Sequence, residues 1–155
     1  MKILSVANNT RRRKLQVKTR RGVYPFPYSR LKPKPSRANP IIDVYVDREI
    51  GDEGFTYSLL SGGEATVHVD AVLDFNEDPA YLTDALLYRL TVEARRRADQ
   101  SSVGTRELSR RLRTSASQLY RLLEPTNYRK SVRQMIELLH ALDCDVDFVV
   151  KRRRA

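Results

Sequence analysis

Apolar and polar residues alternate with a period of two along the first half of the chain, which is the pattern of half-buried strands. The expected strands are residues 2–6, 14–19, 23–28, 42–46, 55–60 and 66–69. Turn signals at 20–22 and 61–64 join neighbouring strands into hairpins. Pro25 and Pro27 allow segment 23–28 only an edge position. The pattern therefore predicts an antiparallel sheet of five or six strands that ends near residue 75.

The period changes to that of a helix at Asp78-Pro79, where Asp suits the N-cap and Pro the first helical position. The first predicted helix runs to about residue 99. Its apolar face is formed by residues four apart, namely Leu82, Leu86, Leu90 and Ala94. Shorter helices follow in 104–112, 117–123 and 131–142. Glu107 is placed to close the N-terminus of the first of these, and Ser131 with Gln134 forms a capping box at the last.

Residues 145–150 alternate again, with Val146, Phe148 and Val150 on one face, and predict a strand that pairs with a sheet edge or a second subunit. The order of elements predicts an α+β protein. Residues 1–78 form an N-terminal antiparallel β domain, and residues 79–155 form a bundle of four or more helices with a short C-terminal strand.

Charge divides the chain into three zones within a net charge of +10. Residues 1–40 hold twelve Lys and Arg and no acid, residues 41–78 hold ten acids and one base, and residues 79–155 hold sixteen bases and nine acids. If the first two zones neutralise each other in one β domain, that domain is a poor nucleic-acid binder by itself. The C-terminal excess has no comparable acidic block beside it, and is the better candidate for nucleic-acid binding.

Composition excludes several classes of protein. The single cysteine, Cys144, excludes an internal disulfide framework and a cysteine-based zinc site, and no stretch approaches the length of a membrane span. Five acids are close in sequence, but no His or Lys joins them at a useful spacing, so we expect a solvated or arm-pairing face: Asp43, Asp47, Glu49, Asp52 and Glu53. We expect a cytoplasmic protein that is not an enzyme and needs no cofactor or metal.

The segment 105–123, TRELSRRLRTSASQLYRLL, has the pattern of a helix-turn-helix. Two short crossing helices need a small residue where they touch, and Ser109 meets that need. Four leucines hold the second helix at a fixed angle: Leu108, Leu112, Leu119 and Leu122. The other face of that helix is then free to enter a major groove.

Residues 79–142 resemble the Xre/Cro-type helix-turn-helix family of bacterial and phage repressors and antitoxins. The resemblance is carried by ELSRRLRTSASQLYRLL from Glu107 and by the apolar pattern of the helix that follows Ser131. In this chain Arg113 stands where the family usually has Gly in the turn, and Leu123-Glu124-Pro125 replaces its common Glu-x-Gly ending.

The resemblance implies a recognition helix at about 115–123 and three groups of DNA contacts. Thr105 and Arg106 contact phosphate at the start of the preceding helix. Ala116, Ser117 and Arg121 reach bases, flanked by Ser115 and Gln118. The loop after the recognition helix contacts the backbone through Asn127, Arg129 and Lys130. Tyr120 either faces the groove or packs inside.

The sequence therefore predicts a sequence-specific DNA-binding transcriptional regulator that acts as a homodimer on double-stranded DNA. An alternative is the antitoxin of a type II toxin–antitoxin system, which autoregulates its operon and binds a toxin or another protein partner through the β domain. A third interpretation is an RNA-binding module that uses the basic arm with Tyr24, Phe26 and Tyr28.

Overall fold

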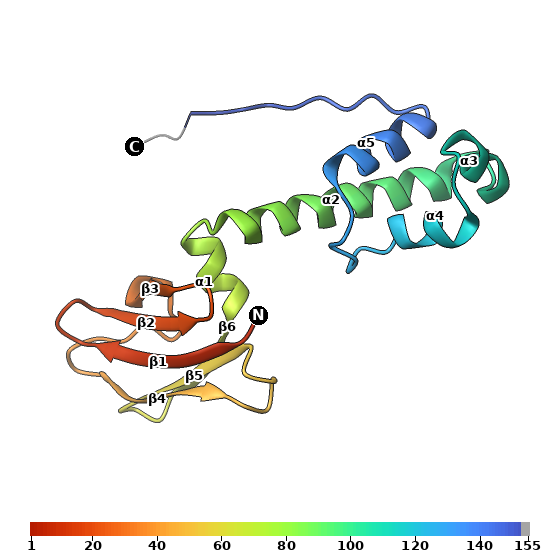
Figure 1. Ribbon diagram of the computed structural model, residues 1–155. Coiled ribbons are helices and arrows are strands. Elements are labelled where there is room, and N and C mark those ends of the chain that lie inside the picture. Colours follow the sequence, from red (N-terminus) through yellow and green to blue (C-terminus); the bar gives the residue numbers. More distant parts are fainter. Residues whose placement is uncertain (153–155) are drawn as a thin grey trace. The chain divides into compact units, whose positions relative to one another are not determined.

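The computed structural model describes residues 1–152 and has an α+β fold, as predicted. It divides into two compact units, Met1–Leu82 and Thr83–Ala155, and the division falls within helix α2 (Figure 1). The first unit contains two antiparallel sheets and a short helix. The second unit is built from helices.

The first sheet is a three-stranded meander in the order β1-β2-β3. Its strands are β1 (Ile3–Asn9), β2 (Lys14–Thr19) and β3 (Val23–Pro27). Leu15 and Val17 of β2 are fully buried, while Gln16 and Lys18 between and beyond them are exposed. The period of two in the sequence thus becomes one core face and one solvent face.

The second sheet has the order β4-β5-β6, so the prediction of a single sheet is wrong. Its strands are β4 (Ile41–Asp47), β5 (Gly54–Leu59) and β6 (Glu64–His68). Pro25 and Pro27 of β3 have no N–H to donate, so β3 ends the first sheet. The chain then passes through the short 3-10 helix η1 (Tyr28–Arg30) and a proline-rich loop before β4 starts the second sheet.

The inner faces of the two sheets share one hydrophobic core, which includes Leu15, Val17, Phe55 and Tyr57. Helix α1 (Val69–Phe75) packs its buried residues Val69, Val72 and Leu73 against it. The alternating sequence pattern does not predict this helix. Its N-cap is His68, whose Nδ1 accepts a hydrogen bond from the backbone N–H of Asp70 at 3.3 Å.

The helices of the second unit follow the predicted order. They are α2 (Pro79–Gln100), α3 (Thr105–Arg111), α4 (Ala116–Leu122) and α5 (Val132–Ala141). The Asp78 Oδ1 atom accepts a hydrogen bond from the Tyr81 N–H at 2.9 Å, as expected of an N-cap. The predicted capping box of Ser131 and Gln134 is also formed.

The buried face of α2 agrees only in part with the predicted one. Ala94 is buried and Leu90 packs against the core, as predicted, whereas Leu82 is exposed; Leu87 and Thr91 are buried in addition. Residues four apart advance by about 40° around a helix of 3.6 residues per turn, so a row of such residues turns away from the core. The mixed spacing of three and four keeps one face inward.

The predicted C-terminal strand does not form in the described part of the chain, where residues 144–150 are extended without a ladder partner. The helical unit provides no sheet edge, and a lone strand has nothing to hydrogen-bond with. Val146 packs against the helical core, while Phe148 and Val150 are exposed.

Candidate nucleic-acid interface

Helices α3 and α4 pack on each other around buried leucines, as the helix-turn-helix pattern predicts. Leu108 and Leu119 are buried, and Leu112 and Leu122 are half-buried against the same core. Ser109 is buried between them, where the pattern requires a small side chain. These contacts fix α4 by its inner face and leave its outer face in solvent.

The turn between α3 and α4 adopts the left-handed conformation at Arg113, with φ of 52°. At this position the Xre/Cro-type family, which this segment resembles, usually has glycine, the residue that tolerates the left-handed conformation best. The Arg113 N–H donates to the carbonyl of Arg110 at 3.1 Å, and the Thr114 N–H donates to that of Ser109 at 2.9 Å. The tight turn is therefore made with arginine in place of glycine.

The N-terminus of α4 is capped by Ser115, whose Oγ accepts a hydrogen bond from the Gln118 N–H at 3.2 Å. This bond satisfies one of the N–H groups that a helix leaves free at its start. The helix begins at Ala116, one residue before the predicted start. Ala116, Ser117 and Gln118 form an exposed first turn.

The outer face of α4 carries Ser117, Tyr120 and Arg121, which lie on one side because they are three or four residues apart. Tyr120 is 62% exposed, so the interpretation as a packed side chain is wrong. Arg121 is also exposed, and no carboxylate in residues 1–152 lies at ion-pair distance from it. This face is polar and carries a planar donor group with no partner in the fold.

The loop after α4 uses two of its three predicted DNA contacts to hold itself together. The Asn127 side chain donates to the Arg121 carbonyl at 2.9 Å and accepts from the Arg129 N–H at 3.1 Å. The Lys130 Nζ donates to the carbonyls of Leu122 and Glu124 at 2.9 and 2.6 Å.

Lys130 is only 6% exposed, and this burial lowers the pKa of its ammonium group. One of its acceptors is the carbonyl of Leu122, the last residue of α4, which has no partner within the helix, and the other is the carbonyl of Glu124, two residues beyond the helix. Lys130 therefore anchors the end of α4. Arg129 next to it is exposed and has no ion-pair partner in the described residues.

Many arginines of the helical unit are neutralised by carboxylates one turn away. Glu93 binds Arg96 and Arg97 at 2.6 and 2.7 Å, and Glu107 binds Arg110 and Arg111 at 2.7 and 3.2 Å. These arginines hold the pKa of both glutamates at about 2. Glu107 is thus occupied by arginines, and the N-cap of α3 is Gly104, which has no side chain to cap with.

Several arginines without a carboxylate partner lie on α4 or in the segments before and after it. Among residues 1–152, four of them lie in the first turn of α3, in the turn before α4, on α4 and in the loop after it: Arg106, Arg113, Arg121 and Arg129. The others described in this unit are Arg89 and Arg95 of α2 and Arg152 of the C-terminal segment. Thr105, the first residue of α3, is exposed beside Arg106. This surface has the cations needed to meet phosphate groups.

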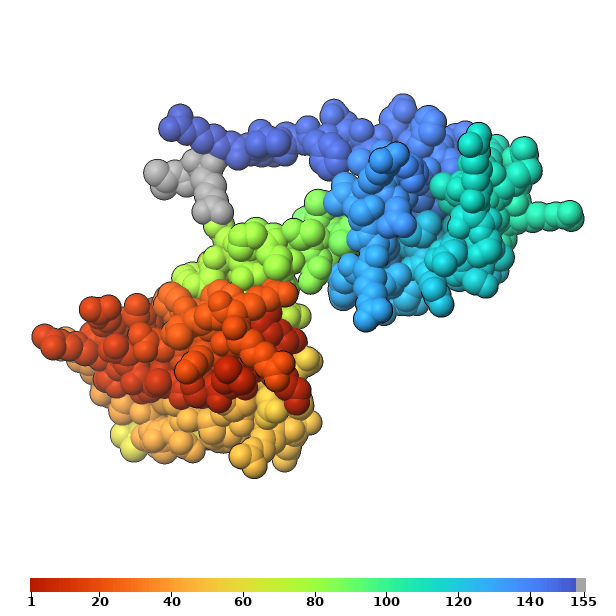
Figure 2. All heavy atoms as spheres, in the orientation of Figure 1, coloured from red at the N-terminus to blue at the C-terminus, as the bar shows by residue number. Residues whose placement is uncertain are grey.

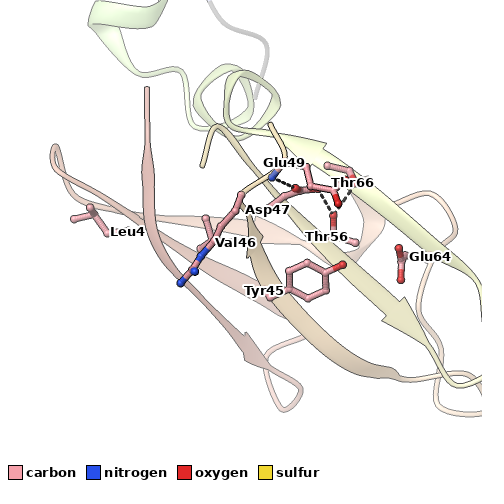
Figure 3. A pocket seen from close by; sticks show the side chains of 9 residues that line it. Leu4, Tyr45, Val46, Asp47, Glu49, Thr56, Glu64 and Thr66 are labelled. Atoms are coloured by element: carbon pink, nitrogen blue, oxygen red, sulfur yellow. Dashed lines mark hydrogen bonds between the residues drawn. The ribbon is translucent and has the colours of Figure 1, made fainter. Parts of the chain in front are cut away.

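Three acidic residues of the first unit, Asp47, Glu49 and Glu64, line a hollow on the second sheet that Leu4 of β1 also borders (Figure 3). Asp47 accepts from the Thr56 hydroxyl and the Glu49 N–H, both at 2.9 Å. The expectation that no histidine joins the acids is wrong, because His68 lies 3.8 Å from Glu53. Glu53 also binds the N-terminal ammonium at 3.1 Å, which lowers its pKa.

No group of three or more His, Cys, Asp or Glu side chains in residues 1–152 is arranged to hold a metal ion. The aromatic residues of the basic arm belong to the fold: Phe26 and Tyr28 are buried, and the Tyr24 hydroxyl donates to Asp78 at 2.8 Å.

None of the helices in residues 1–152 combines the length and the apolar character needed to cross a membrane. Comparison with known proteins found no protein-family model, no curated protein and no solved structure that matches this chain.

Proposed function

We propose that the helical unit binds double-stranded DNA in a sequence-specific manner and that the protein is a transcriptional regulator. The observation that carries this proposal is the outer face of α4. It is polar and exposed, it includes an unpaired Arg121, and the buried Leu108 and Leu119 hold it in place from behind. A rigid helix with such a face fits the major groove of duplex DNA.

The candidate residues have three different roles in this proposal. Ser117, Gln118 and Arg121 are the side chains proposed to contact base edges, and Ala116 is short enough to meet a thymine methyl group. Thr105, Arg106 and Arg129 are proposed to contact phosphates. Three further residues position this surface through hydrogen bonds within the fold: Ser115, Asn127 and Lys130.

A homodimer is part of this proposal, because one recognition helix reads only a short half-site. The extended segment after α5 provides a surface for the contact between two copies, since Phe148, Val149 and Val150 are exposed. Two copies would read an inverted repeat. Sedimentation at micromolar concentration, with and without DNA, checks this, and a monomer under both conditions would contradict it.

Selection of bound duplexes from a random library by the full chain tests the proposal. We expect enrichment of one motif, arranged as two half-sites about one helical turn apart. Arg121→Ala should lose preference at defined positions of each half-site, while Arg97→Ala, which removes an arginine already paired with Glu93, should select the wild-type motif. A library that shows no enrichment with wild-type protein would contradict sequence-specific binding.

A second candidate function, antitoxin, is favoured by the acidic outer face of the second sheet. Asp43 and Glu64 flank Ser58 in adjacent strands, and neither carboxylate has an ion-pair partner in residues 1–152. Such a face fits a basic protein. Copurification with a small basic nuclease-like protein encoded beside this chain tests the idea. Loss of that complex in Asp43→Asn/Glu64→Gln supports it, and its retention contradicts it.

A further inference from the structure

The basic residues of the first 40 positions are largely unneutralised. Of the twelve, Lys2 pairs with Asp52 at 3.2 Å and Arg21 with Asp78 at 3.3 Å. The others have no carboxylate at ion-pair distance in residues 1–152: Arg11, Arg12, Arg13, Lys14, Lys18, Arg20, Arg30, Lys32, Lys34 and Arg37. The expected cancellation between the basic arm and the acidic block is therefore limited to a few pairs.

Several of these cations lie on one side of the first sheet. Alternation along β2 directs Lys14 and Lys18 to the face opposite the buried Leu15 and Val17. The β1–β2 turn contains residues 11–13, and the β2–β3 turn contains Arg20. A strand of six residues spans about 20 Å, so both turns and the strand form one basic ribbon.

The residues that flank Lys14, Gln16 and Lys18 on β1 and β3 are all uncharged. On β1, the residue opposite Lys18 is Ser5, and the residue opposite Gln16 is Ala7; both are small and exposed. The first sheet, red to orange, and the second sheet, yellow, occupy opposite sides of the unit (Figure 2). Among residues 1–152, no acid of the second sheet lies at ion-pair distance from a cation of the ribbon. Salt screens exposed charges beyond about 8 Å.

We propose that the outer face of the first sheet contacts the phosphate backbone of the duplex that the helical unit binds. This inference rests on the proposed function. A row of cations spanning about 20 Å matches a strand that presents one phosphate per 3.4 Å of helix axis, and small neighbours let the backbone approach closely. Contacts of this kind add affinity without reading sequence.

The chemistry of the face favours duplex DNA over single-stranded RNA. Binding of single strands relies on aromatic side chains that stack with bases. The arm's Phe26 and Tyr28 are in the core, and the Tyr24 hydroxyl is held by Asp78. The surface therefore offers positive charge without a stacking platform, which suits a backbone whose bases are already paired.

The test compares two triple variants of the full chain that lose the same charge. Arg12→Gln/Lys14→Gln/Lys18→Gln removes three unpaired cations from the basic ribbon. Arg96→Gln/Arg97→Gln/Arg133→Gln removes three cations that are paired with Glu93 or Glu137. Affinity for the selected duplex, for a scrambled duplex and for a single-stranded RNA is measured from 50 to 200 mM salt.

We expect the ribbon variant to lower the slope of log affinity against log salt by about 2 to 3, because each phosphate contact contributes about 0.9. The ratio of specific to scrambled binding should stay at the wild-type value, since phosphate contacts carry no sequence information. The control variant should keep the wild-type slope.

Three results would overturn the inference. If the ribbon variant keeps the wild-type slope of log affinity against log salt and still prefers the selected duplex, the ribbon contact is refuted and the proposed function stands. A variant that loses binding to single-stranded RNA but keeps duplex binding assigns the ribbon to RNA. A wild-type chain that binds no duplex refutes both proposals.

Discussion

The two sides of the helical unit use arginine differently. On α2 and α5, Arg96, Arg97 and Arg133 each bind a glutamate of their own helix. Around α4, Arg121 and Arg129 point to solvent without a carboxylate partner in residues 1–152. The number of arginines therefore does not identify a binding surface. The neighbouring carboxylates decide which cations are available to a polyanion.

The loop after α4 shows the same contrast within two consecutive residues. Lys130 is buried and donates to two carbonyls at the end of α4, whereas Arg129 is exposed. Sequence position and charge are nearly the same for both. We expect one to determine stability and the other to determine DNA affinity.

The largest expected effect on stability is that of Lys130→Met, which should lower the free energy of unfolding by about 2–3 kcal/mol. The change leaves the Leu122 carbonyl without the ammonium donor, and the Glu124 carbonyl with only the Asn127 N–H at 3.1 Å. Denaturant unfolding measures the loss. Arg129→Met is the matched control and should stay within about 0.5 kcal/mol of wild type. Equal stabilities of the two variants would remove the distinction.

Arg129→Gln should weaken DNA binding by about 1 kcal/mol on every sequence and lower the salt slope by about one, as the loss of a single phosphate contact does. Fluorescence anisotropy with a selected and a scrambled duplex checks this. A loss confined to the selected sequence would instead make Arg129 a base-reading residue.

Arg113→Gly should affect stability and binding in opposite directions. Glycine relieves the left-handed conformation at φ of 52° and should raise the free energy of unfolding by about 0.5–1 kcal/mol. The same change removes an unpaired cation beside α4, so affinity should fall. Arg113→Ala keeps the unfavourable conformation and separates the two effects. If glycine and alanine give equal stability, the turn is not strained.

The smallest effect is expected from Glu93→Gln, because its ion pairs with Arg96 and Arg97 are exposed. These arginines lower the pKa of Glu93 from 4.5 to about 2. A folded-state pKa below the unfolded value stabilises the protein at pH 7, and this contribution is lost as the pH falls from about 4.5 to 2. Denaturant unfolding of wild type and Glu93→Gln across this pH range checks whether the difference in their free energy of unfolding disappears. A difference that stays constant with pH would contradict its origin in the ionised Glu93.

Local rules were sufficient to predict most of the helical unit. The caps at Asp78 and Ser131 and the leucine spacing of α3 and α4 are properties of short segments. The chain forms two sheets because the prolines of β3 have no backbone N–H to donate to a further strand. Helix α1 starts at an N-cap formed by a histidine. Neither follows from periodicity.

Availability of the site residues could not be predicted from sequence. From its charge, Lys130 is a candidate for a phosphate contact. Only the folded loop shows that its ammonium group donates hydrogen bonds to two backbone carbonyls instead. The pairing of Arg110 and Arg111 with Glu107 follows from helical spacing, whereas the freedom of Arg121 depends on which residues fold near it.

The most direct test of the central claim is the affinity ratio between the selected duplex and a scrambled one, measured for wild type, Arg121→Ala and Arg97→Ala. If Arg121 makes a bidentate base contact, its removal should cost about 1–3 kcal/mol on the selected duplex and much less on the scrambled one. Arg97→Ala, which removes an arginine paired with Glu93, should keep the wild-type ratio. An unchanged ratio in Arg121→Ala, or an equal loss on both duplexes, would contradict the proposal that α4 reads DNA sequence.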